Sequence, residues 1–332
     1  MNEKMKSCSR RDFFRTAAFS TVALGTSSLL ADENLTAAAP LAREARKRLA
    51  LNLAVLLPLK IPFLEQLQLV AQAGFRNVEI WFRFLDEYLQ EGGTLAELKA
   101  FLNDLDLRVV GAIGFAPWGV NDPDVRRRAL DTMKVDMERM AALGAETFAA
   151  APSGIHNRTD VELPALAERY RSVLEAGEQF GVFPQLEIWG VGTTLSKLSD
   201  ALWVVSEAAH PRATLLLDVY HLFRGGNDFV SLMQTNPRLM SNFHWNDYPG
   251  DIPREALKDG DRVFPGDGVA PLGEIRRTLE QNGFRGTYSL EIFNQGYCQK
   301  YEPGELMRIS FEKMAKSIFS EYNPEPAGGF AP

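Results

Sequence analysis

The sequence is poor in cysteine and has no excess of positive charge. Its 332 residues include two cysteines, Cys8 and Cys298, which excludes a disulfide framework and a cysteine-ligated zinc site. The formal net charge is -7 at pH 7, whereas a protein that binds nucleic acid needs a concentrated basic face. We therefore expect no nucleic-acid partner, and we expect any metal to be held by oxygen and imidazole ligands.

The glycine-rich signatures of nucleotide binding are also missing. Neither G-x-G-x-x-G nor G-x-x-x-x-G-K-[ST] occurs in the chain. The segment Gly111–Gly114 follows an apolar run, but Phe115 and Pro117 come where a phosphate loop needs backbone amides that open a helix. We expect an ordinary loop at that point and no dinucleotide cofactor.

The first 39 residues have the pattern of an export signal. Arg10 and Arg11 precede Asp12-Phe13-Phe14, and an uncharged stretch follows over residues 16–31. That stretch is too short and too weakly apolar to span a bilayer, and three alanines at 37–39 offer a cleavage site. The arginine pair resembles the twin-arginine signal. We predict a signal peptide over residues 1–39 and an exported, periplasmic protein without a stable membrane anchor; an ordinary N-terminal helix is the alternative.

In the rest of the chain, short apolar runs alternate with segments of helical period, which is typical of βα units. Several of the helical segments end at a glycine, as Leu143-Gly144-Ala145 does. Eight runs are predicted strands: 49–57, 77–81, 107–115, 147–151, 182–189, 214–219, 240–245 and 288–293. Helices are predicted over 62–73, 95–105, 123–143, 162–180, 195–209, 272–282 and 303–321. Because a TIM barrel needs eight such units, we predict one (β/α)8 barrel domain over residues 40–322, followed by a flexible tail over 323–332.

Each of the last four predicted strands ends with one group that can bind a metal. The active site of a TIM barrel is built at the carboxyl ends of its strands, so these groups should share one mouth. Three carboxylates there would repel each other and would be costly to bury without a cation. We predict one divalent metal ion, Mn²⁺ or Mg²⁺ before Co²⁺ or Zn²⁺. Its predicted ligands are Glu187, Asp218, His244 and Glu291.

Each of these residues also has a structural interpretation when it is taken alone. Asp218 could cap a loop, and His244 could be a buried histidine of the core. Glu291 could pair with Arg285. The position of all four residues at the ends of successive strands favours the metal site over these separate explanations.

The motifs around these residues resemble those of the xylose-isomerase-like TIM barrels, in particular the sugar isomerase and epimerase branch. The resemblance covers nearly all of residues 49–320. It rests on the segments LEIW with Glu187, LLLDVYH with Asp218 and His221, FHWND with His244 and Asp247, DRVFPGDG over 261–268, and SLEIFN with Glu291. The apurinic endonucleases are a distant branch, but their zinc cluster needs a histidine after the Asp-Arg pair, where this chain has Val263.

The resemblance implies that the four predicted ligands bind one metal. It also implies that Glu187 and Glu291 face the substrate carbon from opposite sides as an acid/base pair, and that His221 contacts substrate oxygens. The implied activity is isomerisation or epimerisation of a small non-phosphorylated keto-sugar, keto-inositol or hydroxy-keto acid, through a metal-stabilised enediolate. Relatives often form dimers or tetramers, and the sequence leaves the oligomeric state open.

Two other functions remain open at this point. The same proton abstraction followed by loss of a β-leaving group would make the protein a lyase that dehydrates an inosose or cleaves a 3-keto-glycoside. A non-catalytic sugar-binding protein is the other alternative, although binding alone does not need two glutamates at the mouth.

Further substrate contacts are predicted in the loops. Trp81, Phe115 and Trp118 could form an apolar wall against a sugar ring, with filling of the barrel as the alternative. Arg254 could bind a substrate hydroxyl or carboxylate, with a solvated surface arginine as the alternative.

Overall fold

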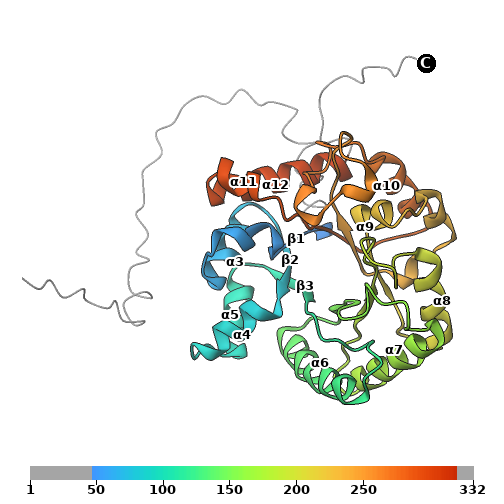
Figure 1. Ribbon diagram of the computed structural model, residues 1–332. Helices are drawn as coiled ribbons and strands as arrows, with labels where there is room; N and C mark the ends of the chain where they lie inside the picture. The colour runs from blue at the N-terminus through green and yellow to red at the C-terminus, as the bar shows by residue number, and fades with distance from the viewer. Residues whose placement is uncertain (1–46, 320–332) are drawn as a thin grey trace, which may run out of the picture. The chain divides into compact units, whose positions relative to one another are not determined.

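The computed structural model describes residues 47–319, so the predicted signal peptide over 1–39 and the predicted tail over 323–332 lie outside the described chain. Eight parallel strands follow one another in the order β3-β2-β1-β8-β7-β6-β5-β4 and curve into a barrel (Figure 1). β1 pairs with both β2 and β8, which joins the two ends of the chain in one sheet. The strands are β1 Leu49–Asn52, β2 Asn77–Trp81, β3 Arg108–Ile113, β4 Ala149–Ala150, β5 Gln185–Glu187, β6 Leu215–Asp218, β7 Asn242–Trp245 and β8 Thr287–Leu290.

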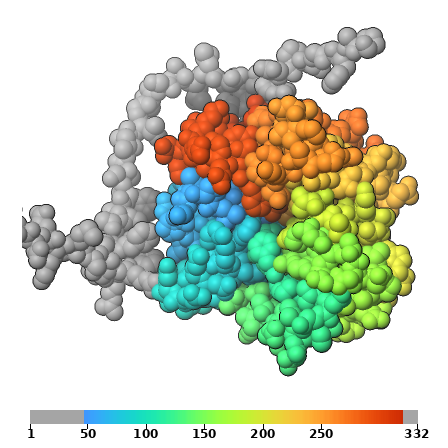
Figure 2. Space-filling view, viewed as in Figure 1, coloured from blue at the N-terminus to red at the C-terminus, as the bar shows by residue number. Residues whose placement is uncertain are grey.

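Helices surround this barrel and pack their apolar faces on the strands (Figure 1). They are α3 Phe63–Gln72, α4 Phe82–Gln90, α5 Leu95–Asp104, α6 Pro123–Leu143, α7 Leu163–Gly177, α8 Leu198–Ala208, α9 Val219–Arg224, α10 Leu272–Gln281, α11 Gln295–Lys300 and α12 Pro303–Ile318. In Figure 2 the earliest described segments lie beside the last ones, in agreement with the pairing of β1 with β8. The predicted TIM barrel is confirmed.

The ends of the elements follow local capping chemistry. Thr94 and Glu97 form a capping box at the start of α5, and Asp122 caps α6, which has a proline at its first position. α6 ends at Gly144, whose φ of 82° is a conformation that favours glycine. These signals explain why the predicted helix over 123–143 has the observed bounds.

Other boundaries differ from the prediction for a physical reason. The predicted strand over 49–57 ends at Asn52, because the side chain of Asn52 accepts the N–H of Ala54 and begins a 3-10 helix over Leu53–Leu59. The helices α4, α9 and α11 were missed. α4 and α9 start directly after the last residue of a strand, and the residue that caps α9, Asp218, also ends the apolar run of β6.

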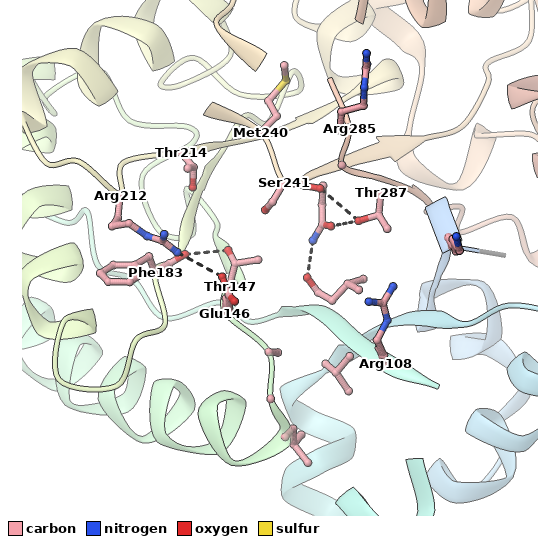
Figure 3. Close-up of a pocket in the computed structure, with 18 of the residues that line it drawn as sticks. Arg108, Glu146, Thr147, Phe183, Arg212, Thr214, Met240, Ser241, Arg285 and Thr287 are labelled. Atoms are coloured by element: carbon pink, nitrogen blue, oxygen red, sulfur yellow. Dashed lines mark hydrogen bonds and ion pairs between the residues drawn. The ribbon is translucent and has the colours of Figure 1, made fainter. Parts of the chain in front are cut away.

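The barrel has a cavity at one end and the predicted metal ligands at the other. A cavity of about 720 Å³ opens at the amino-terminal ends of the strands, and Arg108, Thr147, Thr214, Ser241 and Thr287 are among its lining residues (Figure 3). The predicted metal ligands lie at the opposite end, where the strands finish, so this cavity is separate from the predicted site. No helix in residues 47–319 is long and apolar enough to cross a membrane.

Candidate metal centre and active site

The four predicted metal ligands lie at the carboxyl-terminal end of the barrel, and all are buried. Their exposed fractions are 4% for Glu187, 1% for Asp218, 0% for His244 and 3% for Glu291. Asp218, His244 and Glu291 each offer a ligand atom, and these atoms lie within 4.8 Å of one another. Glu187 ends the adjacent strand β5 but falls outside this set of three. The structure therefore groups three of the predicted ligands and places the fourth beside them.

Two buried polar atoms in this cluster have no hydrogen-bond partner among residues 47–319. They are Oε2 of Glu187 and Nδ1 of His244. Nδ1 of His244 lies 3.1 Å from Oε2 of Glu291 and 3.7 Å from Oδ2 of Asp218. Buried polar atoms are normally satisfied, so orphaned atoms among convergent carboxylates fit a cation site. A donor set of three carboxylates and one imidazole suits a divalent ion.

The two glutamates of the cluster have opposite electrostatic environments. Burial and the charges of Glu291 and Asp218 raise the pKa of Glu187 to about 8. Burial acts in the same direction on Glu291, but the nearby charges of His244 and Arg262 hold its pKa well below the usual range. The protein alone therefore does not keep both carboxylates ionised at neutral pH, as expected where like charges share a site.

Two of the structural roles considered above, a cap for Asp218 and an ion pair for Glu291, can be compared with the structure. Asp218 does cap a helix: its Oδ1 accepts the backbone N–H of His221 at the start of α9, while its Oδ2 faces the cluster. Glu291 does not pair with Arg285, which donates to the backbone carbonyls of Glu280 and Phe284 instead. Asp218 thus combines a capping role with a place in the site.

Arg262 belongs to this site, although no role was predicted for it. It is 1% exposed, and its Nη1 lies 2.7 Å from Oε2 of Glu291 and 3.0 Å from Oδ2 of Asp218. Its Nη2 donates to Asp259 at 2.6 Å. The Asp-Arg pair of the DRVFPGDG segment was the available signal, but loop residues have no period from which their direction can be predicted.

The loop that carries Arg262 is held in place by Asp247. One oxygen of this buried carboxylate accepts the N–H groups of Gly266 and Gly268, and the other accepts those of Tyr248 and Ala270. The backbones of Asp247 and residue 263 also form an antiparallel bridge. Asp247 therefore fixes the loop, and nothing places it among the metal ligands.

His221 lies in the same cluster, as the resemblance implies. Its Nδ1 accepts the backbone N–H of Gly190, and its Nε2 lies 3.0 Å from Nη2 of Arg262. Burial and the nearby charge of Arg262 lower the pKa of His221 to about 4. Because a guanidinium only donates, Nη2 of Arg262 is the donor in this contact, and the neutral ring has one acceptor nitrogen for either this N–H or that of Gly190. His221 is therefore held between a backbone amide and the buried arginine of the cluster.

Aromatic rings from four strand ends lie in a row beside the cluster. Trp81 contacts Phe115 and Phe293 with ring centroids 5.5 Å and 6.1 Å apart, and Phe115 lies 6.1 Å from Trp189. Phe115 is 47% exposed, so part of this row is open to solvent. Trp81 and Phe115 thus lie where an apolar wall was predicted, and we call the four rings the aromatic row.

Two predicted substrate contacts lie elsewhere. Trp118 is 2% exposed, packs on Tyr170 of α7 and donates its indole N–H to the carbonyl of Ala151. This corrects the prediction, because Trp118 fills the space between strands and helices and does not join the wall. Arg254 is exposed, pairs with Glu255 and lies over the ring of Phe223. No contact joins it to the cluster, and its role in substrate binding stays a prediction.

Relatives of the chain include several isomerases. An inosose isomerase of Bacillus velezensis is 26% identical over 264 residues, which cover 78% of this chain and 92% of that protein. A putative hydroxypyruvate isomerase of Streptomyces coelicolor is 26% identical over 282 residues, or 79% of this chain and 92% of that protein. Other relatives are 3-dehydroshikimate dehydratases and a fructoselysine 3-epimerase.

The fold is also found among solved structures. The IOLI protein, determined with a binding zinc atom, superposes with a TM-score of 0.76 at 22% identity. The match covers 84% of this chain and 100% of that one. The family described as xylose isomerase-like TIM barrel matches residues 67–317, a range that includes every residue of the cluster. The chain belongs to the xylose isomerase-like TIM barrel family.

Proposed function

We propose that this protein is a divalent-metal-dependent isomerase or epimerase of a small non-phosphorylated keto-sugar, keto-inositol or hydroxy-keto acid. One observation carries the proposal: Asp218, His244 and Glu291 converge at the barrel mouth beside Glu187, and the cluster holds orphaned ligand atoms. The isomerases and epimerases among its relatives support the reaction class.

Glu187, Asp218, His244 and Glu291 would hold the metal ion. A bound divalent ion would polarise the substrate carbonyl and stabilise the negative charge that develops when a neighbouring C–H bond is broken. Mn²⁺ or Mg²⁺ suits the carboxylate-rich set, and Co²⁺ and Zn²⁺ are the alternatives. The zinc atom in the IOLI structure supports a divalent ion in this fold.

The protein side chains would move the proton and hold the substrate. One of Glu187 and Glu291 takes the proton from the carbon next to the carbonyl, and the electron pair of the C–H bond passes to the carbonyl oxygen. A proton returned to the other face of that carbon gives an epimer. A proton returned to the former carbonyl carbon gives an isomer, with the proton of the adjacent hydroxyl passing to the former carbonyl oxygen. His221 contacts substrate oxygens, Arg262 holds the carboxylates of Asp218 and Glu291 in place, and the aromatic row packs against the C–H face of the ring.

A lyase is the second candidate, and a specific observation favours it. Dehydratases are among the relatives, and they share the matched region of the chain. The same proton abstraction followed by departure of a β-hydroxyl or aglycone would give an unsaturated product. An inosose or a 3-keto-glycoside would be the substrate in that case.

Incubation in D₂O with a panel of keto-sugars and inososes, followed by NMR, tests the proposal and separates the two reactions. We expect deuterium at the carbon next to the carbonyl, with no loss of water or aglycone. A dehydrated or unsaturated product would establish the lyase. Treatment with a chelator should abolish the exchange and added Mn²⁺ or Mg²⁺ should restore it; full activity in the metal-free protein would refute the metal role.

We also propose that the protein is exported to the periplasm by a twin-arginine route. The support is the pair Arg10-Arg11 before an uncharged stretch. Replacement of both arginines by lysine should retain the protein in the cytoplasm, as measured by cell fractionation. Unchanged export of this variant would refute the proposed route.

A further inference from the structure

Glu79 is a buried carboxylate inside the barrel that the proposed chemistry does not use. It lies on β2, is 1% exposed, and reaches the centre of the barrel past Gly111 of β3. A Cβ at position 111 would lie 2.6 Å from Oε1 of Glu79, so the glycine leaves the space that this side chain needs. The register of β2 against β3 shifts at the same point, between Val78 and Glu79.

Three neutral side chains donate hydrogen bonds to this carboxylate. Oε2 accepts from Nδ2 of Asn52 at 3.3 Å and from Oγ of Ser289 at 2.5 Å. Oε1 faces Nδ2 of Asn242 at 3.4 Å. These donors come from β1, β8 and β7, so Glu79 ties together strands that are far apart in the sequence.

The orientation of each amide is fixed independently of Glu79. Oδ1 of Asn52 accepts the N–H of Ala54 at 2.9 Å and the indole N–H of Trp81 at 2.8 Å, so its Nδ2 has to face the carboxylate. Nδ2 of Asn242 donates to the carbonyl of residue 110 at 2.7 Å, while its oxygen accepts the hydroxyl of Thr287. Glu79 is therefore surrounded by donors.

The fourth partner of Glu79 is the predicted metal ligand His244. Nε2 of His244 lies 3.0 Å from Oε2 of Glu79. Because this carboxylate oxygen also accepts from Asn52 and Ser289, it is the acceptor here, and the ring nitrogen carries the proton and donates it. The other nitrogen, Nδ1, faces Asp218 and Glu291 and has no hydrogen-bond partner.

We propose that Glu79 is a positioning residue that holds His244 with its proton on Nε2, so that Nδ1 is the nitrogen that binds the metal. The inference rests on the proposed metal site and adds the residue that orients its imidazole. A carboxylate behind a ligating histidine fixes the tautomer and the ring plane and makes the imidazole a better ligand. The first half of the barrel thereby contributes to a site whose proposed ligands all come from the second half.

Glu79→Gln is the informative variant. It preserves shape but replaces one acceptor oxygen by an NH₂ group, so at least one of the four surrounding donors loses its acceptor. We expect Zn²⁺ and Mn²⁺ to bind the metal-free variant ~10- to 100-fold more weakly than they bind wild type, as measured by calorimetry. Asp136→Asn is the matched control, because it makes the same change at another buried carboxylate, on α6, and should leave metal affinity unchanged.

A second readout is the tautomer itself. The chain has four histidines, so ¹⁵N-histidine labelling gives few imidazole signals to assign. In the zinc-loaded wild-type protein we expect His244 to show a protonated Nε2 and a metal-bound Nδ1, and in Glu79→Gln a loss of that pattern. If Glu79→Gln fails to fold, Glu79→Asp is the second variant. It keeps a carboxylate on a shorter side chain, which moves the acceptor away from Nε2 of His244. We expect it to weaken metal binding as well.

The outcomes separate this inference from the proposed function. If wild type binds no divalent metal, the proposed function fails. If wild type binds metal, and folded Glu79→Gln binds it equally tightly with the same His244 tautomer, only the role of Glu79 is overturned. Binding through Nε2 in wild type would overturn it as well.

Discussion

The two halves of the barrel use the same βα architecture for different purposes. The strands β5 to β8 end at or beside Glu187, Asp218, His244 and Glu291, so the proposed chemistry lies in the second half. The strands β1 to β4 contribute apolar residues and hydrogen-bond partners, and from them Glu79 alone adds a carboxylate to the cluster's contacts in the described chain. The comparison teaches that a complete site needs both halves, although only one half has a recognisable pattern of ligands.

Removal of the proposed acid/base groups should show the largest effect. We expect Glu187→Gln and Glu291→Gln to remain folded and to lower turnover by at least ~10², because each removes a proton-transfer group. Steady-state kinetics and circular dichroism measure both properties. The first-half control Asp136→Asn should keep normal turnover, and a near-normal rate in either glutamate variant would remove it from the acid/base pair.

Arg262 and Arg254 compare a buried arginine of the site with an exposed arginine of a neighbouring loop. Arg262→Gln leaves Asp218 and Glu291 without their cationic partner, and we expect kcat/KM to fall ~10- to 100-fold, with reduced stability. Arg254→Gln should change kcat/KM less than ~2-fold, since an exposed ion pair contributes little. A larger loss at Arg254 than at Arg262 would reverse this assignment and support the substrate contact predicted from the sequence.

Trp118 and Phe115 separate core packing from substrate contact within the first half. We expect Trp118→Ala to lower the free energy of unfolding by about 3 kcal/mol, because it empties a buried site, and to leave KM unchanged in the folded fraction. Phe115→Ala should do the opposite, with a higher KM and a stability change below about 1 kcal/mol. Denaturant unfolding and substrate kinetics on both variants check the pair; a raised KM in folded Trp118→Ala would return Trp118 to the wall.

Asp136 gives the smallest effect, on the pH dependence of stability. Burial raises its pKa to about 7, against the lowering effect of Arg139. A folded-state pKa above the unfolded value means that its contribution to stability is complete below about pH 4 and is lost as pH rises through about 7. Asp136→Asn should therefore flatten the stability profile across this interval and stabilise the protein above pH 7 by about 1 kcal/mol. An unchanged profile in urea unfolding would contradict the assignment.

The sequence was sufficient to predict the barrel, and it named three residues that the structure brings together, Asp218, His244 and Glu291. Alternation of apolar runs with helical periods marks every βα unit, and Glu187, Asp218, His244 and Glu291 each interrupt an apolar run near its end. Glu79 also interrupts such a run, but its partners His244 and Ser289 come from strands that lie 165 and 210 residues away, so only the closed barrel brings them together.

Loop geometry accounts for most of what could not be predicted. Arg262 enters the site because Asp247 holds the following loop through four backbone N–H groups, a contact that no periodic pattern encodes. Trp118 and Trp81 follow neighbouring strands, yet one turns outward onto Tyr170 and the other donates inward to Asn52. The direction of a side chain beyond a strand end depends on the local backbone, which residue type alone does not determine.

The most direct test of the account is anomalous diffraction from crystals of the protein loaded with Mn²⁺ or Zn²⁺. We predict one ion per chain at the carboxyl-terminal mouth, bound by carboxylate oxygens of Glu187, Asp218 and Glu291 and by Nδ1 of His244. An ion bound elsewhere, or no ion at these four residues at saturating metal, would contradict the central claim.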